Sequence, residues 1–263
     1  MSQINVDIVE PFTSGADFVT VNGMNAAYTS SGTIQLTNGT WPDKSPAVNS
    51  VVIGQQAGVN AYSQSNVLIG NSAGGELTLS GSFNTFVGES TGAAVTSGAN
   101  NTLIGKYAGW SPVSLTTGSN NICIGNQANT ATATASNTIT LGNSSITTLR
   151  CAVTTITSLS DARDKKDVAP IELGLEFVKE LNPVKFVWDD RNEEGKHDVV
   201  DSGFIAQDLK ALEDKYEAAD VLKLVYDENP EKLEASYGRL IPVLVKAIQE
   251  LTAKVETLEN KKK

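Results

Sequence analysis

The chain has 263 residues and a formal net charge of −10 at pH 7, a length that accommodates about two or three modest domains. The acidic balance argues against a nucleic-acid partner, because neutralising phosphates requires clustered lysine and arginine. Residues 1–11 lack the basic start and apolar run of a secretory signal, and no window reaches the roughly 18 apolar residues that span a bilayer. We therefore expect a protein assembled in a cytoplasm, without membrane insertion.

The charged residues are distributed unevenly along the chain. Residues 50–149 carry only three charged side chains, Glu76, Glu89 and Lys106, whereas residues 160–263 carry 24 acidic and 17 basic ones. A change from nearly uncharged to densely charged sequence indicates two different architectures.

The N-terminal segment, residues 1–47, contains two short stretches of alternating apolar residues. They run from Ile4 to Ile8 and from Phe18 to Val21, and they predict two strands. Two roles fit such a segment: attachment of the chain to a larger particle, or a capping unit for the repeats that follow.

Residues 48–150, the repeat shaft, contain a motif N-x-x-(I/V)-G-x-x-(A/T)-G whose first glycines lie 16 to 20 residues apart. The apolar stretches are Val51–Ile53, Val67–Ile69, Thr85–Val87, Thr102–Ile104 and Ile122–Ile124, with a looser copy at 137–142. Each copy predicts a very short strand between Asn and Gly, which tolerate positive φ. Stacking the copies buries apolar faces that a lone short strand would expose, so the shaft is predicted to be a β-solenoid.

The scarcity of charge in the repeat shaft also bears on its assembly. Few side chains could solvate an isolated thin coil, so we expect three chains to wind together as a trimeric solenoid or triple β-helix. A monomeric solenoid with a surface of Ser, Thr and Asn is the alternative. The repeats resemble the head repeats of trimeric bacterial adhesins and the shaft repeats of phage fibres, which implies a homotrimer.

Two further features of the shaft concern possible sites. The longest insertion between repeats runs from Trp110 to Asn120, and Tyr107 and Trp110 are candidates for receptor contact, because aromatic faces suit sugar rings. Packing of these aromatics between chains is the alternative. Cys123 lies in a repeat strand and is expected to be a core residue. Two cysteines and one histidine, His197, predict no metal site, and no cofactor motif is present.

The charged C-terminal third predicts an α+β domain. One helix is expected over residues 174–181, and residues 203–209 are expected to lead into a further helix that ends at about residue 216. Strands are expected over 183–188 and 221–226, and a hydrophilic loop over 193–201. The segment 151–159 is expected to link this domain to the shaft.

A heptad pattern closes the chain, over about residues 240–260. Apolar residues recur at 3-4-3-4-3 spacing, at Ile241, Leu244, Ile248, Leu251, Val255 and Leu258. About two and a half heptads are too few for a stable isolated helix, so we expect a short coiled coil at the end of a trimer. A single amphipathic helix packed on its own domain is the alternative.

Five blocks of the C-terminal third resemble the phage-fibre intramolecular chaperone domain, peptidase family S74. They are Ser160–Lys165, Gly174–Leu175, Leu181–Val184 with Phe186–Trp188, Gly203–Gln207 and Ala247–Leu251. The resemblance runs in order from about residue 159 to the end, and residues 1–47 resemble virion-proximal ends of small phage fibres. The resemblance to the chaperone family implies that residues 160–263 drive trimerisation of the shaft, set the register of its chains and then cut themselves away.

The resemblance also implies where and how the chain is cut. Family cleavage falls before the serine of S-D-x-R-x-K, which places it between Leu159 and Ser160, with Ser160 as nucleophile and Lys165 as base. A serine hydroxyl needs such a base, and a lysine serves only when desolvation or a nearby cation lowers its pKa. Arg163 and Lys166 could act as that cation, and Asp161 or Asp164 could orient the loop. Read alone, this run could also be a charged linker.

Together these features predict a subunit of a trimeric phage tail fibre, a virion protein assembled in the host cytoplasm. Its predicted partners are phage tail or baseplate proteins and a host cell-surface receptor, with a glycan as one candidate. Any enzymatic activity would be a single self-cleavage by a Ser/Lys dyad. In the alternative, the chaperone is retained uncut as a permanent trimerisation cap. A glycan-degrading enzyme is disfavoured, since it needs paired carboxylates and the shaft offers only Glu76 and Glu89.

Overall fold

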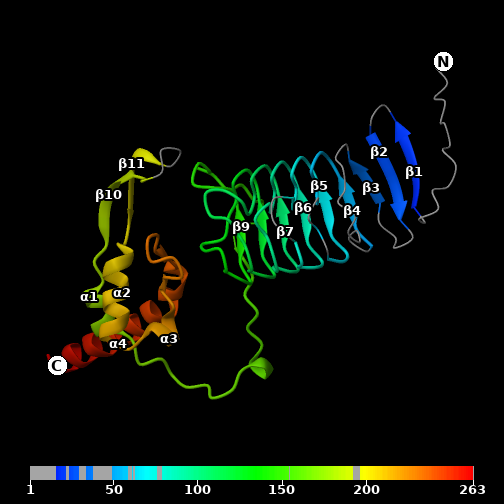
Figure 1. Cartoon of the computed structure of the whole chain (residues 1–263). Helices are drawn as coiled ribbons and strands as arrows, with labels where there is room; N and C mark the ends of the chain where they lie inside the picture. Colours follow the sequence, from blue (N-terminus) through cyan, green and yellow to red (C-terminus); the bar gives the residue numbers. More distant parts are fainter. Residues whose placement is uncertain are drawn as a thin grey trace. The chain divides into compact units, whose positions relative to one another are not determined.

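The computed structural model describes residues 16–21, 24–29, 34–37, 49–58, 61, 63–75, 79–153, 155–191 and 196–262. Side chains are described from residue 49 onwards. The chain divides into two compact units, Met1–Ile146 and Thr147–Lys263 (Figure 1). Within these ranges no helix is both long and apolar enough to cross a membrane.

The first unit is built on one nine-stranded sheet, and the later strands of this sheet belong to a β-solenoid of about five turns. Strands β1 (Ala16–Val21), β2 (Met24–Thr29) and β3 (Ile34–Thr37) pair antiparallel, and β3 then pairs in parallel with β4 (Val51–Ile53). The remaining strands stack in parallel, in the order β5 (Val67–Ile69), β6 (Thr85–Val87), β7 (Thr102–Ile104), β8 (Ile122–Ile124) and β9 (Ile139–Leu141). The predicted solenoid is confirmed, as is the strand near residue 18; the strand predicted at residues 4–8 lies outside the described residues.

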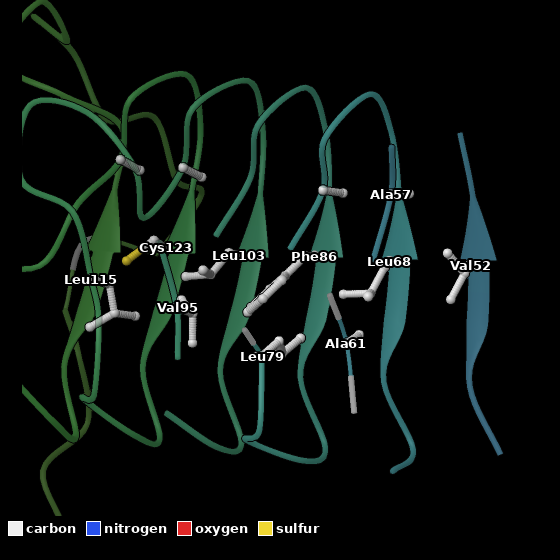
Figure 2. Close-up of a cluster of buried hydrophobic side chains, with 13 residues drawn as sticks. Val52, Ala57, Ala61, Leu68, Leu79, Phe86, Val95, Leu103, Leu115 and Cys123 are labelled. Carbon is white, nitrogen blue, oxygen red and sulfur yellow. The ribbon is translucent and has the colours of Figure 1, made fainter. Parts of the chain in front are cut away.

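The interior of the solenoid is filled by columns of side chains, one from each turn. The middle residue of each strand from β4 to β8 is fully buried, and these residues follow one another along the stack: Val52, Leu68, Phe86, Leu103 and Cys123 (Figure 2). Five residues later, small side chains form a second buried column, at Ala57, Ala73, Thr91, Ala108 and Ala128. Leu79, Val95 and Leu115 fill the interior from another side of the coil. The sequence motif therefore repeats because each turn must contribute side chains of similar shape to one continuous core.

An asparagine precedes each strand from β5 to β8 and is also buried, in a ladder that runs through the stack. The Asn101 amide nitrogen donates to the Gly118 carbonyl at 3.0 Å, and its Oδ1 accepts from the Asn121 backbone N–H at 3.0 Å. Asn84 is bonded to the turn above it in the same way. An asparagine side chain offers both a donor and an acceptor, so it satisfies buried backbone groups of successive turns.

The glycine after each strand from β4 to β8 is required by close approach of the neighbouring turn. Gly88 has φ of +140°, and a Cβ added there would lie 2.5 Å from the Gly105 carbonyl oxygen. Any side chain at this position would push two turns apart.

The second unit is a mixed α/β domain whose core lies between its helices. A short 3-10 turn, η1 (Ala162–Asp164), precedes α1 (Leu175–Glu180), the antiparallel pair β10 (Val184–Asp189) and β11 (His197–Gly203), α2 (Ala206–Lys215) and α3 (Ala219–Leu222). Then follow β12 (Val225–Tyr226), which pairs with β13 (Glu234–Ala235), a second 3-10 turn η2 (Tyr237–Arg239), and α4 (Leu240–Asn260). The core comprises Phe177, Leu209, Leu212, Ala218, Leu222, Leu224, Leu240 and Val243.

Two predictions for this domain are wrong. The strand expected over 221–226 is confined to Val225–Tyr226, because α3 brings Leu222 into the core. The buried Glu213 carboxylate fixes this change of direction by accepting from the Leu224 backbone N–H at 2.6 Å. The loop expected over 193–201 contains the start of β11, a strand that polar residues can form because it is exposed and pairs along β10.

Candidate functional site

The segment around Ser160 forms a compact turn. The Asp161 side chain caps η1 by accepting from the Arg163 backbone N–H at 2.9 Å. The far end is closed by the Lys165 N–H, which donates to the Ala162 carbonyl at 3.2 Å. This local hydrogen bonding makes the charged run a defined turn within the described part of the chain.

The turn brings Ser160 and Lys165 together. The Lys165 ammonium donates to the Ser160 hydroxyl oxygen at 2.6 Å and to the Ser160 carbonyl oxygen at 2.9 Å. A nucleophile and its base must lie within hydrogen-bond reach of each other. The two residues that the sequence singled out as nucleophile and base meet this geometric condition.

A second polar contact in the turn joins Asp161 and Arg163. The Arg163 guanidinium donates to both carboxylate oxygens, at 3.0 Å and 3.2 Å from Nε and at 2.6 Å from a terminal nitrogen. These bonds lower the pKa of Asp161 and raise that of Arg163. The Arg163 charge is therefore engaged by Asp161.

The turn is open to solvent in the single chain. The described residues from 155 to 170 are all exposed, and Leu159, on the acyl side of the expected cleavage bond, is fully exposed. A lysine becomes a base through desolvation or a nearby unpaired cation. The single chain aligns Ser160 and Lys165, but it leaves both residues exposed to solvent and so does not desolvate the lysine.

Helix α4 has two apolar faces with different surroundings. Leu240, Val243 and Ala247 are buried against the rest of the domain, and the Glu250 carboxylate accepts from the Leu175 N–H at 2.8 Å, at the start of α1. The residues of the heptad pattern form the other face, and all of them are exposed: Ile241, Leu244, Ile248, Leu251, Val255 and Leu258. The helix thus packs on its domain through residues outside the heptad pattern and leaves the pattern itself uncovered.

The solenoid has an uncovered apolar face of its own, which the sequence reasoning missed. The first and third residues of each strand point outward and form two columns. One column is Val51, Val67, Thr85, Thr102, Ile122 and Ile139, and the other is Ile53, Ile69, Val87, Ile104, Ile124 and Leu141. Ile104 and Ile124 expose 37% and 41% of their surface. The available signal was the lack of alternation in these strands, which is typical of strands covered on both faces.

The aromatic residues proposed for receptor contact lie on one turn of the solenoid. Tyr107 and Trp110 are half-buried, and the Lys106 ammonium lies 4.7 Å from the centre of the Tyr107 ring. The insertion from residue 110 to 120 is not a free loop, since Leu115 is fully buried in the solenoid core. The part available for contact is accordingly shorter than the sequence indicated.

The remaining residues considered for chemistry have structural surroundings. Cys123 is buried in the core as predicted, and burial raises the pKa of its thiol to about 11. The His197 Nδ1 lies 3.1 Å from an Asp189 carboxylate oxygen across the hairpin of β10 and β11. Among the described residues, no group of three or more His, Cys, Asp and Glu side chains could hold a metal ion.

Comparison with known proteins bears on the second unit. The family model Peptidase S74, the chaperone of endosialidase, matches residues 160–219, beginning at the serine of the turn. The matched residues include α1, the hairpin and α2. None of the curated proteins and none of the solved structures compared with the chain matches it. This match supports an intramolecular chaperone domain in the C-terminal unit, similar to this family over residues 160–219.

Proposed function

We propose that this protein is a subunit of a trimeric phage tail fibre whose chaperone domain drives assembly and then cuts the chain between Leu159 and Ser160. The observation that carries the proposal is the 2.6 Å contact between Lys165 Nζ and Ser160 Oγ, at the residue where the chaperone family match begins. The family implies trimeric assembly and occurs in phage tail proteins.

Two uncovered surfaces support a three-chain particle. The outward columns of the solenoid leave isoleucine and leucine exposed in the single chain, at Ile104, Ile124, Ile139 and Leu141, and the heptad face of α4 leaves isoleucine, leucine and valine exposed. Contiguous exposed apolar surfaces of this kind mark interaction sites. Because each surface repeats along its element, a second and a third copy of the chain are the partners that match it in length and spacing.

The cleavage step follows from the geometry of the turn. Lys165 accepts the Ser160 hydroxyl proton while Oγ attacks the Leu159 carbonyl carbon; the peptide C–N bond then breaks, and the proton passes to the departing nitrogen. Water hydrolyses the resulting ester, which frees the Leu159 carboxylate and restores the Ser160 hydroxyl. Because both groups belong to adjacent residues, their effective concentration is high. Assembly would supply the desolvation that turns Lys165 into a base.

The fragments of the expressed protein test this function. Wild type should yield residues 1–159 and 160–263, and the smaller fragment should begin Ser160-Asp161-Ala162. Ser160→Ala removes the nucleophile and Lys165→Ala the base, so each should leave an intact chain. Lys166→Ala, an equal loss of charge at the next residue, should still be cut. Cutting of Ser160→Ala, or another fragment start, would exclude the dyad; an uncut wild-type trimer would favour the retained cap.

The repeat shaft is proposed to serve host attachment, with tail or baseplate proteins and a host-cell receptor as partners. Tyr107 and Trp110 remain the predicted receptor contacts. Their half-buried rings, beside Lys106, would suit a glycan, and packing between chains is the competing role.

A further inference from the structure

The turn places a competing anion beside the proposed catalytic pair. Asp161 directly follows Ser160, so its carboxylate is the closest acidic group in sequence to the atom that Lys165 must reach. An ion pair between Asp161 and Lys165 would favour the protonated lysine. It would also draw the ammonium away from the Ser160 hydroxyl. A lysine intended as a base must avoid this pairing.

Arg163 occupies the Asp161 carboxylate on both of its oxygens. The guanidinium meets the two oxygens through Nε and a terminal nitrogen, and the Arg163 backbone N–H adds a bond at 2.9 Å. Such planar, two-pronged pairing is specific to arginine, because a lysine ammonium is a single point charge. With the carboxylate engaged, Lys165 Nζ contacts Ser160 Oγ and the Ser160 carbonyl oxygen.

We propose that Asp161 and Arg163 form a clasp that positions Lys165 for self-cleavage by closing the η1 turn and withholding the Asp161 carboxylate from the lysine. The inference rests on the proposed self-cleavage. The clasp gives Arg163 the role of holding Asp161 in place, instead of the role of a free cation that lowers the pKa of Lys165. Asp161 and Arg163 are positioning residues, whereas Ser160 and Lys165 carry the reaction.

The clasp predicts a suppressor relationship. Arg163→Gln releases Asp161 to pair with Lys165, so cutting near neutral pH should slow by about tenfold or more, as for a shift of one pKa unit. The pH midpoint of the cutting rate should rise. Adding Asp161→Asn removes the anion but keeps an acceptor for the N–H of residue 163, so the double variant should regain the wild-type midpoint.

Two further variants separate geometry from charge. Arg163→Lys keeps the positive charge but cannot engage both carboxylate oxygens, so it should also cut slowly. Asp164→Asn removes the same charge as Asp161→Asn, from the carboxylate four residues after Ser160, and should cut like wild type. Normal cutting by Arg163→Lys would support the free-cation role and overturn the clasp. A double variant no faster than Arg163→Gln would overturn it as well.

A readout independent of cutting separates this inference from the proposed function. In the intact Ser160→Ala chain, the titration of Lys165 can be followed by carbon-13 NMR of labelled lysine, assigned with Lys165→Arg. Its midpoint should rise on Arg163→Gln and return with Asp161→Asn. An unchanged midpoint would refute the clasp even if wild type cuts; the expected rise and return would support it even if wild type does not.

Discussion

At the scale of single residues, the buried asparagine before each of the strands β5 to β8 determines how one turn of the solenoid joins the next. Asn101 is fully buried, yet each of its polar atoms has a partner in a neighbouring turn. Burying an amide is tolerated only when its hydrogen bonds are satisfied. Asparagine therefore suits this position of the repeat because its side chain carries both a hydrogen-bond donor, the amide nitrogen, and an acceptor, Oδ1.

Replacement of Asn101 by alanine should destabilise the shaft by about 2–4 kcal/mol, because buried backbone groups lose their partners. Thermal unfolding at a fixed scan rate would measure the loss as a lower melting temperature. Asn126→Ala removes the same side chain from an exposed position and should change the melting temperature little. Equal effects of the two substitutions would show that the ladder does not stabilise the shaft.

At the scale of elements, α4 shows how one helix can serve its own domain and a partner at once. Its inner face packs through Leu240, Val243 and Ala247, and Glu250 caps α1. Its heptad face points elsewhere and is uncovered. A helix held in place on its domain presents the heptad face with little further ordering, which lowers the entropic cost of association.

Substitution of Leu251 by aspartate should prevent association of the α4 helices, because it would bury a carboxylate among apolar side chains. If cutting depends on assembly, this variant should remain uncut as well as fail to trimerise. Ala253→Asp places the same charge on an exposed position outside the heptad face and should assemble and be cut normally. Light scattering and the fragment pattern on a denaturing gel measure both properties. Undisturbed assembly of Leu251→Asp would mean that the heptad face is not an interface.

At the scale of the whole molecule, the outward columns of the solenoid bear on the number of chains in the particle. Three-residue strands with apolar residues on both faces are typical of sheets covered on both sides. One side is covered by the solenoid's own interior, and the other is uncovered in the single chain. Burial of this second side against further copies would link the shape of the shaft to its assembly.

Light scattering of the uncut Ser160→Ala protein should give three times the 27.8 kDa of one chain. Adding Ile104→Glu should lower that mass or strongly reduce the melting temperature of the particle, because a carboxylate would face the apolar columns. Thr117→Glu introduces the same charge at an exposed position outside the strands and should leave the trimer intact. A monomeric parent protein, or an Ile104→Glu trimer of unchanged stability, would contradict this interface.

The sequence by itself determined the features that depend on local order. The spacing of Asn, apolar residues and Gly determined the solenoid, because every turn must supply the same side chains to one core. The heptad spacing determined that residues 240–260 form a helix, and the blocks from Ser160 onwards indicated the chaperone domain. Each of these signals is carried by residues that are near one another in the chain.

Only the tertiary structure decided which surfaces are covered and which charges pair. Several cations and carboxylates crowd the turn after Ser160, and spacing alone does not distinguish Arg163 as the partner of Asp161 from Arg163 as a free cation. Likewise, Leu115 appeared to belong to a loop but is buried in the core, and the structure shows that α4 packs on its domain through Leu240, Val243 and Ala247, which lie outside the heptad pattern. The physical reason is that burial depends on contacts between distant parts of the chain, and the Asp161–Arg163 pair depends on the backbone conformation of one turn, whereas periodicity records only the regular spacing of residues.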